Sequence, residues 1–147
     1  MRHADAEEGS PDDERKLSER GEREARTAGA ALAALGVSFD ACVSSPKVRA
    51  VDTARLVCAE LEGPEPEADD RLAGGSFDPD EVAAGHGEHV LLVGHDPDFS
   101  EAVQVATGAR VQMKKTGLAA IEERELKLLL RPGELEAIAQ VAAARST

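Results

Sequence analysis

The chain has 147 residues, a length that suits one domain with a buried core and is short for two. Lysine and arginine number 17 against 29 aspartate and glutamate residues, so the net charge at pH 7 is −12. This charge repels nucleic-acid phosphates and anionic lipid headgroups, and we expect neither a nucleic acid nor a membrane as partner. With no Trp, no Tyr and 3 Phe, the core must be aliphatic.

The apolar segments of the chain are short. None approaches the roughly 18 residues of a membrane span, and the N-terminus lacks the apolar block of a signal peptide, so the predicted location is the cytoplasm. Cys42 and Cys58 both lie on apolar patterns, which predicts two reduced cysteines in the core. No pair of Cys or His has the spacing of metal ligands, so we expect no metal and no cofactor.

The first half of the chain predicts a polar loop, a helix, a strand and a second helix. Residues 1–16 are polar, and Ser18 is a suitable N-cap for an amphipathic helix that stops at Gly36. A short strand is expected over residues 41–44. Ser45 and Pro46 then fit the N-cap and the first helical position of a second helix that ends at Gly63 and Pro64.

The second half predicts one buried strand, a hairpin and two helices. Residues 65–87 are acidic and rich in Gly and Pro, and we expect a surface excursion there. The apolar run 90–93 is typical of a central strand covered on both faces. A third helix is expected up to Gly108, and the remaining elements are strands at 118–121 and 126–130 and a last helix at 132–144.

Strands that alternate with helices predict a single domain, residues 1–147, with a three-layer α/β/α sandwich and a largely parallel central sheet. In such sheets ligands bind beyond the carboxyl ends of the strands. Arg49 follows the first strand within the first turn of a helix, where free N–H groups attract an anion. His95 leaves the strand 90–93 toward the same edge, after Gly94. We therefore expect Arg49 and His95 to converge.

Arg2 and His3, at the N-terminus, complete a candidate phosphoryl-transfer site. An Arg can hold a phosphate through two parallel hydrogen bonds, and a neutral imidazole is a competent nucleophile toward phosphorus. Arg2, Arg49 and His95 would neutralise the charge that develops on the phosphoryl oxygens. For each residue there is a plainer alternative: His3 as a frayed terminus, Arg49 as a surface partner of Asp52 or Glu60, and His95 as a packed strand-end histidine.

These residues resemble the histidine phosphatase superfamily, and in particular its short branch, the SixA-type phosphohistidine phosphatases. The resemblance spans nearly the whole chain and rests on five motifs in the family's order and spacing. They are Arg2-His3-Ala4-Asp5-Ala6; Leu17-Ser18-Glu19-Arg20-Gly21; Ser44-Ser45-Pro46 with Arg49, Ala50, Thr53 and Ala54; Val93-Gly94-His95-Asp96-Pro97 with Ser100; and Lys115-Thr116-Gly117-Leu118-Ala119.

The resemblance implies a phosphoglycerate-mutase-like fold and a metal-independent phosphatase. It implies that His3 attacks phosphorus and is transiently phosphorylated, while Arg2, Arg49 and His95 bind the phosphoryl oxygens. Larger family members carry a Glu acid for which residues 65–87 offer no equivalent. Asp5 and Asp98 are the candidates for a general acid. A site without a strong acid favours phosphohistidine, because the leaving nitrogen can be protonated beforehand.

One departure from the family lies at the start of the chain. Family members have an apolar strand directly before Arg-His, in the middle of the sheet, whereas only Met1 precedes Arg2 here. We expect that the first strand is missing or truncated because the natural start lies upstream. A chain that starts at Met1 should then hold Arg2 and His3 poorly, since neighbouring strands would keep unpaired backbone groups.

The expected substrate is a phosphorylated protein, with phosphohistidine favoured, and the expected state is a monomer. One alternative is a phosphatase of small phosphomonoesters that uses the same site. The other is a catalytically degenerate module that binds phosphate or a protein. Lys114 and Lys115 could extend a substrate rim or form a solvated turn, and the acidic run 12–14 is interpreted as surface.

Overall fold

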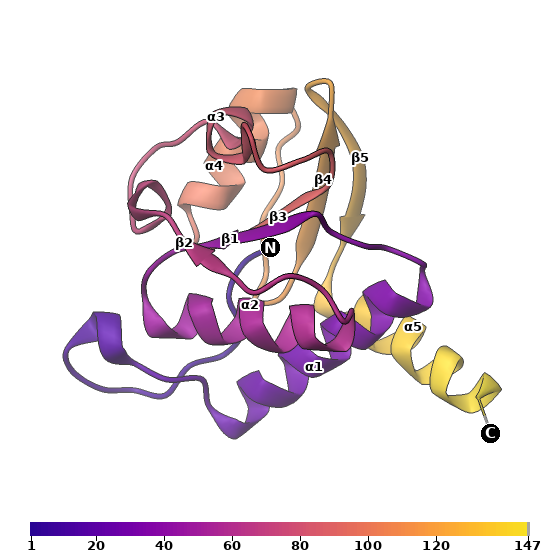
Figure 1. Ribbon diagram of the computed structural model, residues 1–147. Helices are drawn as coiled ribbons and strands as arrows, with labels where there is room; N and C mark the ends of the chain where they lie inside the picture. The colour runs from indigo at the N-terminus through magenta and orange to yellow at the C-terminus, as the bar shows by residue number, and fades with distance from the viewer. Residues whose placement is uncertain (147) are drawn as a thin grey trace.

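The computed structural model describes residues 1–146 and forms three layers, with strands between two sets of helices (Figure 1). The three parallel strands β1 (Ala41–Ser44), β2 (Glu67–Ala68) and β3 (Val90–Val93) are arranged in the order β2-β1-β3. An antiparallel hairpin of β4 (Leu118–Glu122) and β5 (Glu125–Leu130) forms a second sheet. This is the mixed α/β sandwich that the sequence predicts, with the parallel part shorter than a full central sheet.

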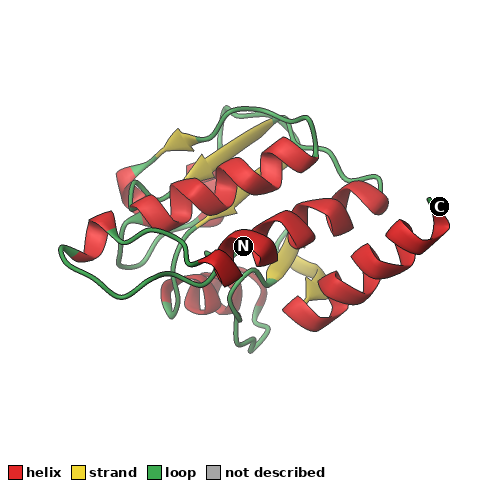
Figure 2. Cartoon of the chain, turned by 90° about the horizontal axis from the view of Figure 1, so that it is seen from below, coloured by secondary structure: helices red, strands yellow, loops and turns green. Residues whose placement is uncertain are grey.

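Three long helices cover one face of the strands. They are α1 (Glu19–Ala34), α2 (Val48–Glu60) and α5 (Pro132–Arg145), and α1 packs against both of the others. Figure 2, seen from below, shows this layer in front of the strands. The Ser18 side chain accepts a hydrogen bond from the N–H of Gly21 and so caps α1 as predicted. No helix among residues 1–146 is long and apolar enough to cross a bilayer.

The opposite face is covered by α4 (Asp98–Thr107) and by the segment between α2 and β3. That segment contains β2, the 3-10 turn η2 (Asp70–Leu72) and α3 (Pro79–Ala83). Leu72 and Val82 are buried there against Phe99 of α4. The prediction of a surface excursion over residues 65–87 is therefore wrong in part, because two apolar side chains turn inward and close the second core.

The strands separate two hydrophobic clusters by their alternating side chains. Cys42 and Leu91 pack with α1 and α2, while Val43 and Leu92 belong to the cluster beneath α4. Both cysteines are free and buried, as predicted. Helix α2 starts at Val48 and not at Pro46, because the Ser45 hydroxyl accepts a bond from the N–H of Lys47 and faces the site described below.

Residues 1–3 lie beside the C-terminal end of β3 and are held by backbone hydrogen bonds on two sides. Toward β3, the Gly94 N–H donates to the Met1 carbonyl (3.1 Å) and the His3 N–H donates to the Gly94 carbonyl (2.9 Å). Toward the hairpin, the Arg2 N–H donates to Gly117 and the Arg2 carbonyl accepts from Thr116 (3.2 and 3.0 Å). The expectation that Arg2 and His3 would be poorly held is therefore wrong: both are anchored between the two sheets.

Behind Met1 an apolar cavity of about 540 Å³ lies between β3 and β4. Val90, Leu91 and Leu92 line one side, and Leu118, Ala119 and Ala120 line the other. The Met1 amino group donates to the Leu92 carbonyl (2.8 Å) at the end of this cavity. Since both backbone groups of a strand residue point to the same side, the Leu92 N–H also faces the cavity. We interpret this cavity as room for further strand residues between β3 and β4.

Four or five apolar β-branched residues added ahead of Met1 are expected to raise the melting temperature by several degrees. Such a segment would continue the parallel pairing with β3 and bury apolar side chains, each worth roughly 1.5–3 kcal/mol when fully buried. A Gly/Ser extension of equal length is the control for added chain length. Equal thermal denaturation midpoints for the two extended proteins would contradict the interpretation of the cavity.

Candidate active site

The site lies at the carboxyl ends of β1 and β3, where Ser44 and Val93 end their strands. The residue after each strand turns toward the other: the Ser45 N–H donates to the Val93 carbonyl (2.9 Å). Gly94 has no Cβ, and one built there would lie 2.5 Å from the Phe99 ring. Glycine is therefore required where the chain passes α4 and bonds to residues 1–3.

His3 is 9% exposed and lies beside His95, with ring centroids 5.2 Å apart. Its Nδ1 is 2.7 Å from the Ala4 carbonyl oxygen. A carbonyl only accepts, so Nδ1 carries the proton and the Nε2 lone pair is free. Burial lowers the pKa of His3 to about 4, and the cationic Arg49, Arg2 and Lys115 oppose protonation further. His3 is therefore a neutral imidazole at pH 7, as a nucleophile must be.

His95 is 7% exposed and is paired with Ser45 through Nε2 and Oγ, 2.8 Å apart. Burial lowers the pKa of His95 to about 3, with added repulsion from His3, Arg49 and Lys47. Nδ1 of His95 is buried and has no hydrogen-bond partner. An anion at this site would favour the tautomer with the proton on Nδ1, in which Nε2 accepts from the Ser45 hydroxyl.

Arg2 and Arg49 each have a buried Nε that lacks a partner. Arg2 donates through NH1 to the Met113 carbonyl (3.1 Å), and Arg49 donates through NH1 and NH2 to Asp12. Buried polar nitrogens are almost always hydrogen-bonded in native proteins, and an exception calls for an explanation such as an ion. Three unpaired N–H donors around a neutral imidazole fit a tetrahedral oxyanion.

Thr53 connects the N-terminal residues to α2. Its hydroxyl accepts from the Ala4 N–H (3.0 Å) and donates to the Arg49 carbonyl (2.7 Å). Thr53 is fully buried, so this link is shielded from water. It fixes His3 relative to Arg49 across 46 positions of the chain, a relation that the sequence motif contains without revealing its hydrogen bonds.

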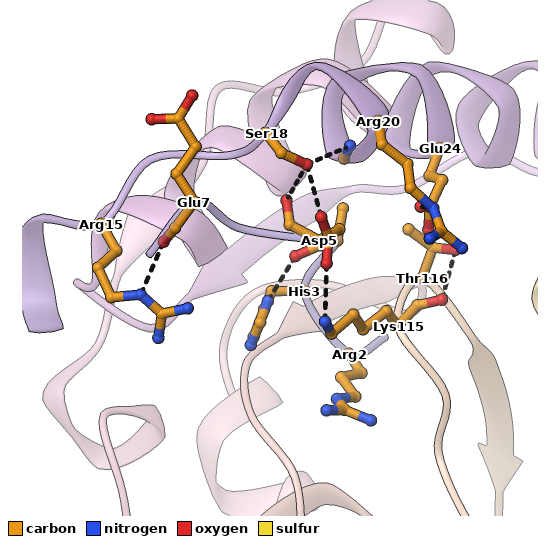
Figure 3. Close-up of polar contacts among 12 residues, drawn as sticks. Arg2, His3, Asp5, Glu7, Arg15, Ser18, Arg20, Glu24, Lys115 and Thr116 are labelled. Carbon is orange, nitrogen blue, oxygen red and sulfur yellow. Dashed lines mark hydrogen bonds and ion pairs between the residues drawn. The ribbon is translucent and has the colours of Figure 1, made fainter. Parts of the chain in front are cut away.

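Asp5 is held between α1 and the hairpin connection (Figure 3). Its carboxylate accepts from the Lys115 ammonium (2.8 Å) and the Ser18 hydroxyl (2.7 Å). These bonds lower the pKa of Asp5, the one to Lys115 most strongly. The N-terminal turn of α1 approaches closely, and a Cβ on Gly21 would overlap the Asp5 carbonyl. Asp5 is an ionised anchor in this arrangement, which counts against its candidacy as a general acid.

The other predicted acid, Asp98, is the first residue of α4. Its carboxylate accepts from the Gly75 N–H (3.2 Å) and borders a second cavity together with Phe77 and Arg124. The structure thus brings Arg2, His3, Arg49 and His95 into one cluster and gives Asp98 a role in holding the loop at Gly75. Among the described residues no three His, Cys, Asp or Glu side chains gather as metal ligands would.

Several residues at the site went unrecognised in the sequence. Ser45, Thr53 and Lys115 stand inside the motifs, but only the fold shows their partners. Asp12 was interpreted as surface, yet its carboxylate lies 3.1 Å from Arg49 NH2. Nothing in the acidic run 12–14 distinguishes Asp12 from its neighbours. Arg49 pairs with Asp12, and Asp52 pairs with Arg55, so the alternative of Arg49 as a partner of Asp52 is wrong.

The fold and these buried donors define an α/β protein with a cluster of polar side chains at a strand edge. A family model described as histidine phosphatase superfamily (branch 1) matches residues 1–81. An uncharacterized protein of Picosynechococcus sp. is 30% identical over 125 residues, which cover 78% of this chain and 76% of that protein. The chain belongs to the histidine phosphatase superfamily.

Solved structures of similar fold agree with this membership. The protein histidine phosphatase SixA complexed with tungstate has a TM-score of 0.79 at 24% identity, covering 92% of this chain and 96% of that one. A protein assigned as the phosphohistidine phosphatase SixA of Agrobacterium tumefaciens has a TM-score of 0.76 at 24% identity, covering 90% and 95%. The predicted SixA-type, phosphoglycerate-mutase-like fold is confirmed, and the family supports a hydrolase of the phosphatase class.

The free energy of unfolding is expected to fall as the pH is lowered from 7 to 5.5. Folding lowers the pKa of His3 and His95 below the ordinary 6.5, so the unfolded chain binds more protons than the folded chain in this range. The expected loss is about 1 kcal/mol for each histidine, measured by urea denaturation at the two pH values.

A protein with both His3→Gln and His95→Gln is the control for this pH dependence. It keeps the Met1 amino group, whose pKa burial lowers to about 5 and which acts in the same direction. The double variant should therefore lose less stability than the wild type between pH 7 and 5.5. An equal loss in the two proteins would show that the histidines do not carry the effect.

Proposed function

We propose that this protein hydrolyses phosphorylated substrates through a covalent phosphohistidine on His3, and that phosphohistidine in a protein is the preferred substrate. The observation that carries the proposal is the set of three buried, unpaired nitrogens on Arg2, Arg49 and His95 around the neutral His3 ring. A tetrahedral dianion would accept from all three at once. The tungstate complex of the SixA neighbour is in keeping with a site for such anions.

In the first step Nε2 of His3 attacks phosphorus and the bond to the leaving group breaks. The Nδ1–H of His3 stays on the Ala4 carbonyl, which stabilises the positive charge that the ring gains. Arg2, Arg49 and His95 hold the equatorial oxygens, and Nδ1 of His95 donates because Ser45 donates to its Nε2. In the second step water attacks the phosphorus of the intermediate, and phosphate leaves with the ring restored.

The choice of phosphohistidine rests on the state of the acids near the site. An alkoxide leaving group needs a proton from a neutral acid as its bond breaks. Asp5 is kept ionised by Lys115 and Ser18, and Asp98 is engaged with Gly75, so neither is arranged to supply that proton. An imidazole leaving group can be protonated beforehand and needs less help. Phosphoryl transfer from nitrogen is therefore the reaction that these groups favour.

The charge and size of the chain lead to further expectations about its oligomeric state, location and partners. We infer that the protein acts as a monomer in the cytoplasm, with a phosphorylated protein as partner and without a metal or other cofactor. The same site could hydrolyse small phosphomonoesters, or it could bind phosphate without turnover. These two functions are the outcomes against which the proposal is tested.

Wild-type protein is expected to accumulate acid-labile, base-stable phosphate when mixed rapidly with a phosphohistidine peptide, and His3→Ala is expected to accumulate none. Removing the nucleophile should lower kcat by a factor of at least about 100. Rapid-quench labelling measures the intermediate, and phosphate release measures kcat. Equal kcat/KM values for the peptide and for an alkyl phosphate would contradict the substrate preference.

A matched control is His86→Ala, which removes a histidine that pairs with Glu67 and is not in the cluster. It should leave labelling and turnover unchanged. Phosphate binding without labelled intermediate in the wild type would show a binding module. Turnover in His3→Ala at the wild-type rate would show that another group attacks phosphorus.

A further inference from the structure

The loop between residues 7 and 16 places the carboxylate of Asp12 beside Arg49, the arginine proposed above to bind phosphate. Its two ends are joined by the bridge of Ala6 with Leu17 and by the bond from the Glu7 N–H to the Lys16 carbonyl. Its tip is the 3-10 turn η1 (Asp12–Glu14), which projects beside the N-terminal end of α2 (Figure 1). The tip is exposed throughout, and Asp12 reaches back toward the cluster around His3.

Asp12 occupies both terminal nitrogens of Arg49. Its carbonyl accepts from NH1 (2.8 Å) and its Oδ2 accepts from NH2 (3.1 Å). The same Oδ2 is 3.6 Å from the Lys47 ammonium. The Arg49 side chain is 8% exposed and fixed within α2, whereas Asp12 is 55% exposed on a projecting loop. Of these two partners, the loop is the one that can move.

The contacts of Asp12 resemble those that a phosphoryl group would make. A phosphate can bind the forked guanidinium through two oxygens, and the carbonyl and Oδ2 of Asp12 occupy NH1 and NH2 in the same way, so the two compete for these N–H groups. The hydrogen bonds from Arg15 and Arg49 lower the pKa of Asp12 to about 2, and it therefore stays anionic at any pH at which the protein works. A phosphoryl group that binds Arg49 through its terminal nitrogens must displace Asp12, whereas one that binds only the free Nε leaves Asp12 in place.

We propose that Asp12 is a specificity-determining residue that competes with the phosphoryl group for the terminal nitrogens of Arg49, so that full engagement of Arg49 by phosphate, beyond its free Nε, requires the 7–16 loop to swing away. This inference rests on the proposed function, because it takes Arg49 as a phosphate ligand. Arg15 holds the other oxygen of Asp12 (3.0 Å) and belongs to the same loop. When the loop swings away, Asp12 loses Arg49 and Lys47, and the η1 turn loses the contacts that hold it against α2.

The competition has two consequences for the reaction. The apparent affinity for an anion is the intrinsic affinity multiplied by the fraction of molecules in which Arg49 is free of Asp12, and free phosphate has no other contacts to compensate for this loss. A larger substrate recovers the loss through contacts beyond the phosphoryl group. Asp12 thus discriminates against free phosphate and against small phosphomonoesters, and it returns to Arg49 as the product leaves.

Asp12→Asn is expected to bind inorganic phosphate and tungstate about tenfold more tightly than the wild type, because an amide no longer competes as an anion. Isothermal titration calorimetry at constant ionic strength measures both dissociation constants. Asp13→Asn is the matched control: Asp13 lies on the same turn and contacts Lys47 (3.7 Å), and its replacement removes the same charge. Affinity should change by less than about twofold in that control.

Hydrogen exchange in the wild type provides a second readout. Saturating phosphate should accelerate exchange of the Arg15 amide, which donates to the Asp12 carbonyl oxygen in the closed loop. A positioning role, in which Asp12 orients Arg49 for phosphate, predicts slower exchange and weaker binding by Asp12→Asn.

The outcomes separate this inference from the proposed function. If the wild type binds phosphate and Asp12→Asn binds it equally or more weakly, the competition is wrong and the oxyanion site stands. Equal gains in Asp12→Asn and Asp13→Asn would also overturn the inference, since general electrostatics would then explain them. If neither wild type nor Asp12→Asn binds phosphate or tungstate, both the oxyanion site and the competition are wrong.

Discussion

The grouping of buried hydrogen-bond donors beside His3 is the constraint on which the rest of the site depends. Arg2 and Arg49 bring two positive charges to the rings of His3 and His95, and burial denies these charges the water that would stabilise them. The protein meets this cost by keeping both imidazoles neutral. With both rings neutral, Arg2 and Arg49 are the two positive charges beside them, which match the two negative charges of the phosphoryl dianion that we propose as ligand.

Backbone bonding makes this unfavourable gathering possible. Residues 1–3 are fixed to Gly94 on one side and to residues 116 and 117 on the other, and Thr53 ties Ala4 to the Arg49 carbonyl. The side chains themselves make few stabilising contacts with one another, so their positions come from these main-chain anchors. A site whose groups repel needs such rigid support, since freely rotating side chains would separate.

Most elements and the four clustered residues could be predicted because their signals are local. Strands 41–44 and 90–93 have the predicted bounds, and Gly108 ends α4 in the left-handed conformation, as glycine allows. Strand β2 is two residues long, and its partner lies in β1, so its own sequence carries no strand pattern. The roles of Ser45, Thr53 and Asp12 depend on contacts 37 to 50 positions away, which no local pattern encodes.

The net negative charge of the molecule opposes the positive charge of the site, and Asp12 is an acidic residue at the border of that site. A chain with a net charge of −12 repels free phosphate at long range, while Arg2, Arg49, Lys47 and Lys115 concentrate positive charge at one edge of the sheet. Acidic groups at its border, Asp5 on Lys115 and Asp12 on Arg49, reduce the positive charge without filling the space between the histidines. Asp5 is held by Ser18 within the fold, so its carboxylate lowers the positive charge of the site permanently. Asp12 lies on an exposed turn, so its carboxylate can move away when the proposed substrate binds.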